Sequence, residues 1–228
     1  MIEICDIRFR WDSKTPVVLN IPSFQILAGE LVFLEGPSGS GKTTLLNLLS
    51  GMVLPEQGSV SVNGEIITRL TDGARDRFRA DHIGVMFQMF NLIPYLSSLA
   101  NVTLPCSFSS RRSTMAAKNG GSLASEASRL LTRMQLDDVA TINSPAYQLS
   151  IGQQQRVAAA RSLIGSPELI IVDEPTSALD NEACKTFIKL LFEEVKKAAM
   201  TLIFISHDTR LAEYFDRRIS LVDINQIA

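Results

Sequence analysis

The stretch that most constrains the fold of this chain is residues 31–50. It begins with an apolar run over residues 31–34, of the kind that forms a buried parallel strand. Residues 36–43 then follow the pattern Gly-x-x-x-x-Gly-Lys-Thr, and residues 44–50 predict a helix. Glycines let successive backbone N–H groups turn inward around phosphate oxygens, and a helix start adds free donors and a positive dipole end. The order of strand, glycine-rich loop and helix therefore predicts a phosphate-binding loop in an α/β fold.

Two side chains in this loop have specific chemistry. Lys42 can reach the β- and γ-phosphates of a nucleotide, and the Thr43 hydroxyl can ligate Mg²⁺. The alternative is a glycine-rich turn that matches the pattern by accident, which the strand before it and the helix after it disfavour. We predict that the phosphates are bound by Gly36, Pro37, Ser38, Gly39, Ser40, Gly41, Lys42, Thr43 and Thr44.

Length and composition narrow the class of protein. The 228 residues suffice for one large domain, or for one domain with a subdomain. A net charge of −2, from 22 basic and 24 acidic residues, gives no sign of the basic face typical of nucleic-acid binding. Three widely spaced cysteines favour neither a disulfide framework nor a zinc site, and fit a reduced compartment. We expect no signal peptide and no membrane span, because no run approaches 18 apolar residues.

A segment of different character, residues 89–149, lies between the two parts of the chain that alternate strands with helices. Residues 107–122 are rich in Ser, Gly and Asn, and predict a mobile surface connection. Residues 123–134 place their apolar side chains on one face of a helix. We expect residues 89–149 to form a small helical subdomain inserted between strands of the main sheet.

The remaining elements predict an α/β protein with a mainly parallel sheet. Before the insertion we expect strands within residues 2–35, a hairpin over 58–67 with a tight Asn-Gly turn, a helix over 72–81 and a strand over 83–87. After it we expect helices over 152–164, 181–199 and 209–215, and strands over 169–173, 201–206 and 218–222.

Polar side chains follow three of these strands. Asp173 and Glu174 close an apolar strand, where Asp173 would lie near a metal and Glu174 could polarise a water aimed at the γ-phosphate. The plainer interpretation is a strand capped by surface carboxylates. Gln88 could ligate the metal or hold the water, and His207 could contact the γ-phosphate. Their alternatives are an exposed glutamine at a strand end and an ordinary loop histidine.

A second helix start lies at residues 149–156. Ser150 and Gln153 have the spacing of a capping box, which by itself accounts for these residues. The functional interpretation is a second anion site, formed by the Ser150 hydroxyl and Gly152. Because one chain does not need two γ-phosphate sites, that site would serve a second chain.

Together these motifs resemble those of an ATP-binding-cassette (ABC) nucleotide-binding domain, and the resemblance covers nearly the whole chain. In family order they are Walker A (36–43), the Q-loop Gln88, the signature Leu-Ser-Ile-Gly-Gln (149–153), Walker B (169–173), Glu174, the D-loop Ser177–Asp180 and the switch His207. Trp11 falls where the family places an aromatic that stacks on adenine, and its alternative is a core or edge-strand tryptophan.

The resemblance implies a single domain over residues 1–228, with a RecA-like P-loop core and an antiparallel β subdomain at about 1–88 and 150–228, and a helical subdomain at about 89–149. It also implies ATP and Mg²⁺, the latter held by Thr43, Gln88 and Asp173, with Glu174, His207 and Gln88 as catalytic residues. Each ATP would lie between one chain's phosphate loop and Ser150, Gly152 and Gln153 of another, in a head-to-tail homodimer or a heterodimer with a similar subunit. Ile151, where the family usually has glycine, departs from the pattern.

Residues 85–94 and 101–105 are similar to the subfamily of lipoprotein-releasing, macrolide-exporting and cell-division ATPases. This similarity implies an ATPase subunit of the export type on the cytoplasmic face of the inner or plasma membrane. It would be held there by an integral membrane permease that contacts the substrate, through a groove that includes Phe90, Leu92, Tyr95 and Leu96. Those four side chains could equally belong to the core of the helical subdomain. A soluble regulatory ATPase switch and a P-loop kinase are the rival classes.

Overall fold

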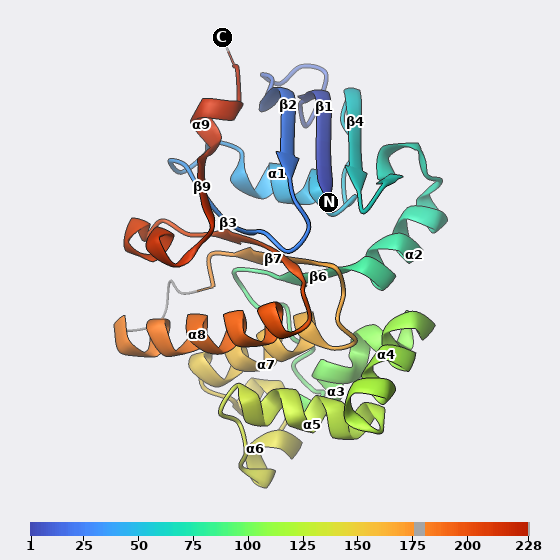
Figure 1. The fold of residues 1–228 in the computed structure, drawn as a ribbon, viewed down its shortest axis with the longest axis vertical. Helices are drawn as coiled ribbons and strands as arrows, with labels where there is room; N and C mark the ends of the chain where they lie inside the picture. The colour runs from blue at the N-terminus through green and yellow to red at the C-terminus, as the bar shows by residue number, and fades with distance from the viewer. Residues whose placement is uncertain (176–180, 228) are drawn as a thin grey trace. The chain divides into compact units, whose positions relative to one another are not determined.

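The computed structural model of the protein describes residues 1–175 and 181–227, so the predicted D-loop, Ser177–Asp180, lies outside the described residues. The chain forms two compact units. The first unit comprises Met1–Arg79 and Thr201–Ala228, and the second comprises Ala80–Met200. The elements of both are drawn in Figure 1.

The first unit contains strands from both ends of the chain. Its strands are β1 (Ile2–Phe9), β2 (Leu19–Ile26), β3 (Leu31–Glu35), β4 (Gln57–Val62), β5 (Glu65–Ile66), β8 (Thr201–Ile205) and β9 (Arg217–Ser220). Its helical segments are α1 (Lys42–Leu49), η1 (Ile67–Arg69), η4 (Thr209–Tyr214) and α9 (Leu221–Ile224), and α2 (Asp72–His82) begins in it.

An antiparallel sheet in the order β2-β1-β4-β5 forms part of this unit (Figure 1). Pro22 has no N–H to donate to a neighbour, and it is accommodated because β2 lies at the edge of the sheet. The turn from β4 to β5 is the predicted Asn63-Gly64 pair, with positive φ angles of 53° and 82°. Both central residues of such a turn need a left-handed backbone, which explains this residue choice.

Strands β8 and β9 pair with β3 on either side, and both pairings are parallel. All five residues of β8 and the first four of β3 are buried, as the apolar runs predict. Phe33, Phe204 and Phe215 form an aromatic cluster here, with ring centroids 5.2 to 6.5 Å apart. The core of the unit is therefore packed against β3, the strand that leads into the glycine-rich loop.

The second unit is mainly helical. Its strands are β6 (Ile83–Met86) and β7 (Leu169–Asp173), which pair in parallel. Its helical segments are α3 (Ser98–Thr103), η2 (Leu104–Ser107), α4 (Ser110–Gly120), α5 (Leu123–Arg133), α6 (Val139–Asn143), η3 (Ala146–Gln148), α7 (Ile151–Leu163) and α8 (Asn181–Lys197). Helix α7 packs against β6 and α8 (Figure 1).

Close packing of β6 on α7 depends on a glycine. A Cβ atom added at Gly84 would lie 2.2 Å from the carbonyl oxygen of Ser162 and 2.8 Å from Cδ1 of Ile170. Ordinary contacts of a Cβ atom are longer than 3.4 Å, so only glycine lets the helix approach the strand this closely.

Two sequence predictions are wrong. Residues 107–122 are not a mobile connection, because 110–120 form helix α4, which Ser109 caps by accepting a bond from the Arg112 N–H. The helix buries one alanine, Ala116, and one charged side chain, Arg112, so it lacks the apolar stripe that periodicity detects. The last strand runs over 217–220 rather than 218–222, and α9 follows it.

The predicted α/β class is confirmed: parallel strands, an antiparallel sheet near the N-terminus, and helices inserted between β6 and α7. Among residues 1–175 and 181–227, no helix has both the length and the apolar character needed to cross a bilayer.

Candidate nucleotide site

The loop between β3 and α1 has the backbone of a phosphate cradle. Gly39 and Gly41 have φ angles of 77° and 100°, in the left-handed region that favours glycine. A Cβ atom at Gly41 would lie 3.0 Å from Leu19 Cδ2, and one at Gly36 would lie 2.8 Å from Ser40 Oγ. Both the backbone angles and the limited space around the loop therefore require glycine at these positions. Helix α1 begins after Gly41 without a side-chain cap, so no cap side chain occupies its first N–H groups.

Two polar side chains in this loop are buried. The Lys42 ammonium donates to the carbonyl oxygens of Gly36, at 2.8 Å, and Pro37, at 3.0 Å, and the residue is only 7% exposed. The Ser40 hydroxyl has no hydrogen-bond partner in the described part of the chain, although it is buried. A buried polar atom without a partner costs stability unless a ligand or water satisfies it. The loop therefore suits an anion with several oxygens.

His207 lies at the same edge of the sheet as the phosphate loop. Leu34 of β3 pairs with Ile205 of β8, so Gly36 and His207 each lie two residues beyond this pair on parallel neighbouring strands. Ser206 is buried and its hydroxyl accepts a 3.1 Å bond from the Asp208 N–H, while the His207 side chain is exposed. The predicted histidine is thus brought to the edge where parallel α/β sheets bind ligands.

Trp11 follows the end of β1 and is 58% exposed. Its ring meets Phe9 edge to face, with centroids 5.1 Å apart, which leaves much of the indole open to solvent. The alternative of a core tryptophan is therefore wrong. An exposed indole in the same unit as the phosphate loop can stack on a planar base.

In the second unit, the ends of β6 and β7 bring three predicted residues together. Met86 pairs with Val172, so Gln88 and Glu174 each lie two residues beyond this pair. Asp173 is 8% exposed, Glu174 is partly exposed and Gln88 is exposed. Glu174 has a φ of 46°, which is uncommon for a residue with a Cβ atom. A left-handed residue directly after a buried strand turns the chain sharply at this carboxylate.

The start of α7 shows the predicted capping box. The Gln153 N–H donates to Ser150 Oγ at 3.3 Å, and the Ser150 N–H donates to Gln153 Oε1 at 2.8 Å. Ser150 and Ile151 are exposed, the latter at 59%. The capping interpretation is therefore confirmed, and the same exposed helix start remains accessible to another molecule.

The residues predicted to ligate a metal offer oxygen atoms, the donors that Mg²⁺ prefers. Residues 1–175 and 181–227 contain no group of three or more His, Cys, Asp or Glu side chains that could hold a metal ion. Mg²⁺ is usually held by one or two carboxylates together with substrate phosphates and water. The Asp173 carboxylate and the Thr43 hydroxyl at the start of α1 are hard oxygen donors of this kind.

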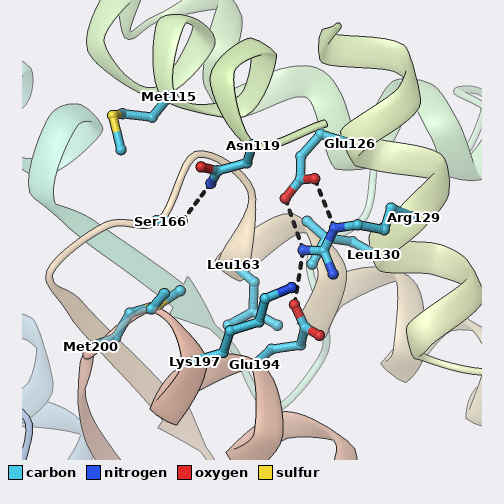
Figure 2. Close-up of a pocket in the computed structure, with 11 residues that line it drawn as sticks. Met115, Asn119, Glu126, Arg129, Leu130, Leu163, Ser166, Glu194, Lys197 and Met200 are labelled. Atoms are coloured by element: carbon cyan, nitrogen blue, oxygen red, sulfur yellow. Dashed lines mark hydrogen bonds and ion pairs between the residues drawn. The ribbon is translucent and has the colours of Figure 1, made fainter. Parts of the chain in front are cut away.

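A separate cavity of about 270 Å³ lies in the second unit, among α4, α5 and α8 (Figure 2). Arg129 crosses it and donates to both carboxylate oxygens of Glu126, at 2.8 and 2.9 Å, and to Glu194 at 2.8 Å. Glu126 and Glu194 are buried at 2% and 4% exposure. Because the carboxylates are already paired, we assign this network to holding α5 on α8 rather than to binding a ligand.

Comparison with known proteins decides the family. The profile of the family described as ABC transporter matches residues 19–177. The chain belongs to the ABC transporter family. It is 40% identical over 211 residues to the lipoprotein-releasing system ATP-binding protein LolD of Anaeromyxobacter dehalogenans, covering 92% of this chain and 84% of that protein. It is also 38% identical to the macrolide export ATP-binding/permease protein MacB of Burkholderia pseudomallei, over 95% of this chain but 32% of that longer protein.

A solved structure agrees with this assignment. The dimeric post-hydrolysis structure of the ATP-binding cassette MJ0796, bound to ADP and Pi, superposes with a TM-score of 0.81 at 32% identity. The match covers 96% of this chain and 94% of that one. This ABC chain therefore has the ABC-type ATPase fold, and it is the ATP-binding subunit of an ABC transporter, with export-type relatives.

Two buried arginines, Arg112 and Arg161, were missed in the sequence. The signal for Arg161 was a charge in a run otherwise formed of alanine and other small or apolar residues, 157–163. A charged residue at such a position is buried only when it is paired or hydrogen-bonded.

Proposed function

We propose that this ABC chain is the ATP-hydrolysing subunit of a membrane complex in which ATP drives head-to-tail pairing of two cassettes. The observation that carries the proposal is the accessible start of α7, where Ser150 and Gly152 form a second anion site that the chain's own phosphate loop does not require. The pair is a homodimer or a heterodimer with a similar subunit.

The bound nucleotide is positioned by residues from both chains. Lys42 and the loop N–H groups bind the β- and γ-phosphates, Trp11 stacks on adenine, and Ser150 of the opposite chain meets the γ-phosphate. Glu174 accepts a proton from the attacking water, Gln88 orients that water, and His207 donates to the γ-phosphate. Mg²⁺, when bound, would supply positive charge at the phosphates, with Thr43, Gln88 and Asp173 as its protein ligands.

A permease would dock on the helical part of the chain, which we place at about residues 89–149. Of the side chains expected there, Phe90 is 8% exposed and belongs to the core, whereas Tyr95 is 76% exposed. Met89 at 81% and Tyr147 at 65% add to the exposed apolar surface, and the Tyr147 N–H donates to the Pro94 carbonyl at 3.0 Å, next to Tyr95. We propose that this patch meets the permease, which contacts the substrate and holds the chain at the cytoplasmic face of the membrane.

The proposal is tested with Glu174→Gln, which keeps the shape of the side chain but removes the base. With ATP and Mg²⁺ the variant should elute as a dimer in size-exclusion chromatography and turn over less than about 1% as fast as wild type, as expected when general-base catalysis worth 10²–10⁴-fold is lost. Adding Ser150→Ala should return it to monomer while the chain still binds ATP. A dimer that persists in the double variant would refute the assigned role of Ser150.

The alternative function, a soluble ATPase switch, is separated by purification from native membranes in mild detergent. A stoichiometric integral membrane protein supports the permease partner. Recovery with soluble proteins and no membrane protein supports the switch.

A further inference from the structure

Arg161 joins α7, the signature helix that begins at residues 149–153, to the segment that follows Gln88. It lies on α7, the helix that begins at the Ser150 cap, and it is only 9% exposed. Its Nη1 donates to the carbonyl oxygen of Asn91 at 2.7 Å, and its Nη2 donates to that of Phe90. One planar guanidinium therefore holds two consecutive carbonyls, which a lysine ammonium cannot match in geometry.

The backbone that Arg161 holds is an unusual one. Phe90 and Asn91 both have positive φ angles, 59° and 48°, in the region that residues with a Cβ atom rarely occupy. The turn closes locally, because the Phe90 N–H donates to the Phe87 carbonyl at 2.9 Å. Two successive left-handed residues persist only where surrounding contacts determine them, and the Arg161 bonds are contacts of this kind.

The turn held by Arg161 contains one of the predicted catalytic residues. Gln88 lies inside the turn 87–91, and the same segment is followed by the exposed Tyr95 of the proposed docking patch. Through Arg161, this turn is tied to the helix that presents Ser150 to the other cassette. Burial lowers the pKa of the Arg161 guanidinium, but the group remains charged at neutral pH.

We infer that Arg161 is a positioning residue that couples Gln88 to the signature helix, so that the turn 87–91 and Ser150 move together. The inference rests on the proposed roles of Gln88 and Ser150. Without Arg161 the left-handed turn loses its two donors and Gln88 samples other orientations, while the phosphate loop keeps its own contacts.

The chain offers a matched control in Arg112. This arginine is 2% exposed and donates to the carbonyls of Ile164 at 2.8 Å, Ser162 at 3.0 Å and Arg161 at 3.3 Å. It caps the last carbonyls of α7 and joins that end to α4. Both arginines thus donate to backbone carbonyls, but the bonds that Arg112 makes within the described residues go to the end of α7 and not to the turn at Gln88.

The experiment measures ATP hydrolysis at 20 °C for wild type, Arg161→Met, Arg112→Met, Gln88→Ala and the Arg161→Met/Gln88→Ala double variant. We expect Arg161→Met to lower kcat at least tenfold with KM for ATP within threefold. The double variant should be no slower than Gln88→Ala, because Arg161 acts through Gln88. Arg112→Met should lower Tm while its kcat stays within twofold of wild type.

Backbone hydrogen exchange gives a second readout, which does not depend on turnover. In Arg161→Met, amides of residues 87–96 should exchange at least tenfold faster, with Arg112→Met unchanged there. Arg161→Lys, which keeps the charge but loses the planar fork, should fall between wild type and Arg161→Met in both assays, and it replaces that variant if Arg161→Met does not fold.

Three results would overturn the coupling. Multiplying defects in the double variant would show that Arg161 and Gln88 act independently. Unchanged exchange of residues 87–96 would show that the turn does not need Arg161. Wild-type turnover of Gln88→Ala would refute the proposed role of Gln88 itself and the coupling with it, which separates that failure from the other two.

Discussion

Arg129→Met tests how much of the second unit's stability comes from the ion network around Glu126 and Glu194. Arg129 supplies both bonds received by the 2% exposed Glu126, whereas Glu194 also accepts a 3.1 Å bond from Arg133. The substitution keeps an apolar stem of similar length but leaves the Glu126 carboxylate buried without its partner. Removing one member of a buried ion pair typically costs about 3–5 kcal/mol.

The magnitude has a ceiling that depends on pH. A stranded carboxylate can escape by taking up a proton, which at pH 7 costs about 3.7 kcal/mol for an ordinary glutamate pKa of about 4.3. At pH 5 the same step costs only about 1 kcal/mol. We therefore expect Arg129→Met to lose about 3–4 kcal/mol at pH 7, and less than half of that at pH 5.

The stability of the wild-type protein also depends on pH through this network. Burial by itself would raise the pKa of Glu194, but hydrogen bonds from Arg129 and Arg133 outweigh it and leave the pKa below its usual range. A carboxyl whose folded-state pKa is lowered stabilises the protein above its unfolded pKa, and that contribution is lost as the pH falls. The difference between wild type and variant must therefore narrow on acidification.

The assay is urea unfolding at pH 7 and pH 5, with thermal unfolding as a check. For a chain of this length, the loss at pH 7 corresponds to a Tm lower by roughly 6–16 °C. Lys185→Met is the control, because Lys185 faces Glu182 across 3.7 Å on the exposed side of α8 and should change stability by less than about 0.5 kcal/mol. A loss below 1 kcal/mol at pH 7, or one that does not depend on pH, would refute this account of the network.

Two further predictions concern the site and the core. Trp11 is the single tryptophan of the sequence, so the intrinsic fluorescence of the protein should change on addition of ATP. In titrations with a fluorescent nucleotide analogue, Trp11→Ala should weaken nucleotide binding about tenfold, whereas Trp11→Tyr should not. Equal affinities for all three would show that the indole does not stack on adenine. Gly84→Ala should lower the free energy of unfolding in urea by about 3 kcal/mol, because its Cβ would lie 2.2 Å from the Ser162 carbonyl oxygen. The control is Gly73→Ala, which has open space around it and should be neutral or stabilising. A Gly84→Ala variant as stable as wild type would show that β6 and α7 can separate at little cost.

The sequence was sufficient wherever a local pattern determines local structure. Strand β7 falls at residues 169–173 as predicted, because a run of apolar side chains is bounded by polar or turn residues at both ends. The glycine-rich loop, the Asn63-Gly64 turn and the Ser150 cap were all readable for the same reason, since each depends on residues within a few positions.

Helix α4 and the buried arginines were decided by the tertiary structure. Nothing near Arg112 in the sequence shows that its guanidinium lies against the carbonyls of residues 161–164, about fifty positions away. The same holds for Arg161 and the carbonyls of Phe90 and Asn91. These two guanidinium groups are buried because distant backbone supplies their acceptors, and that supply depends on how the chain packs and not on the neighbours of each arginine in sequence. The type and order of the motifs were therefore enough to predict the chemistry of the site. The contacts that hold those motifs in place depend on the packing of distant segments.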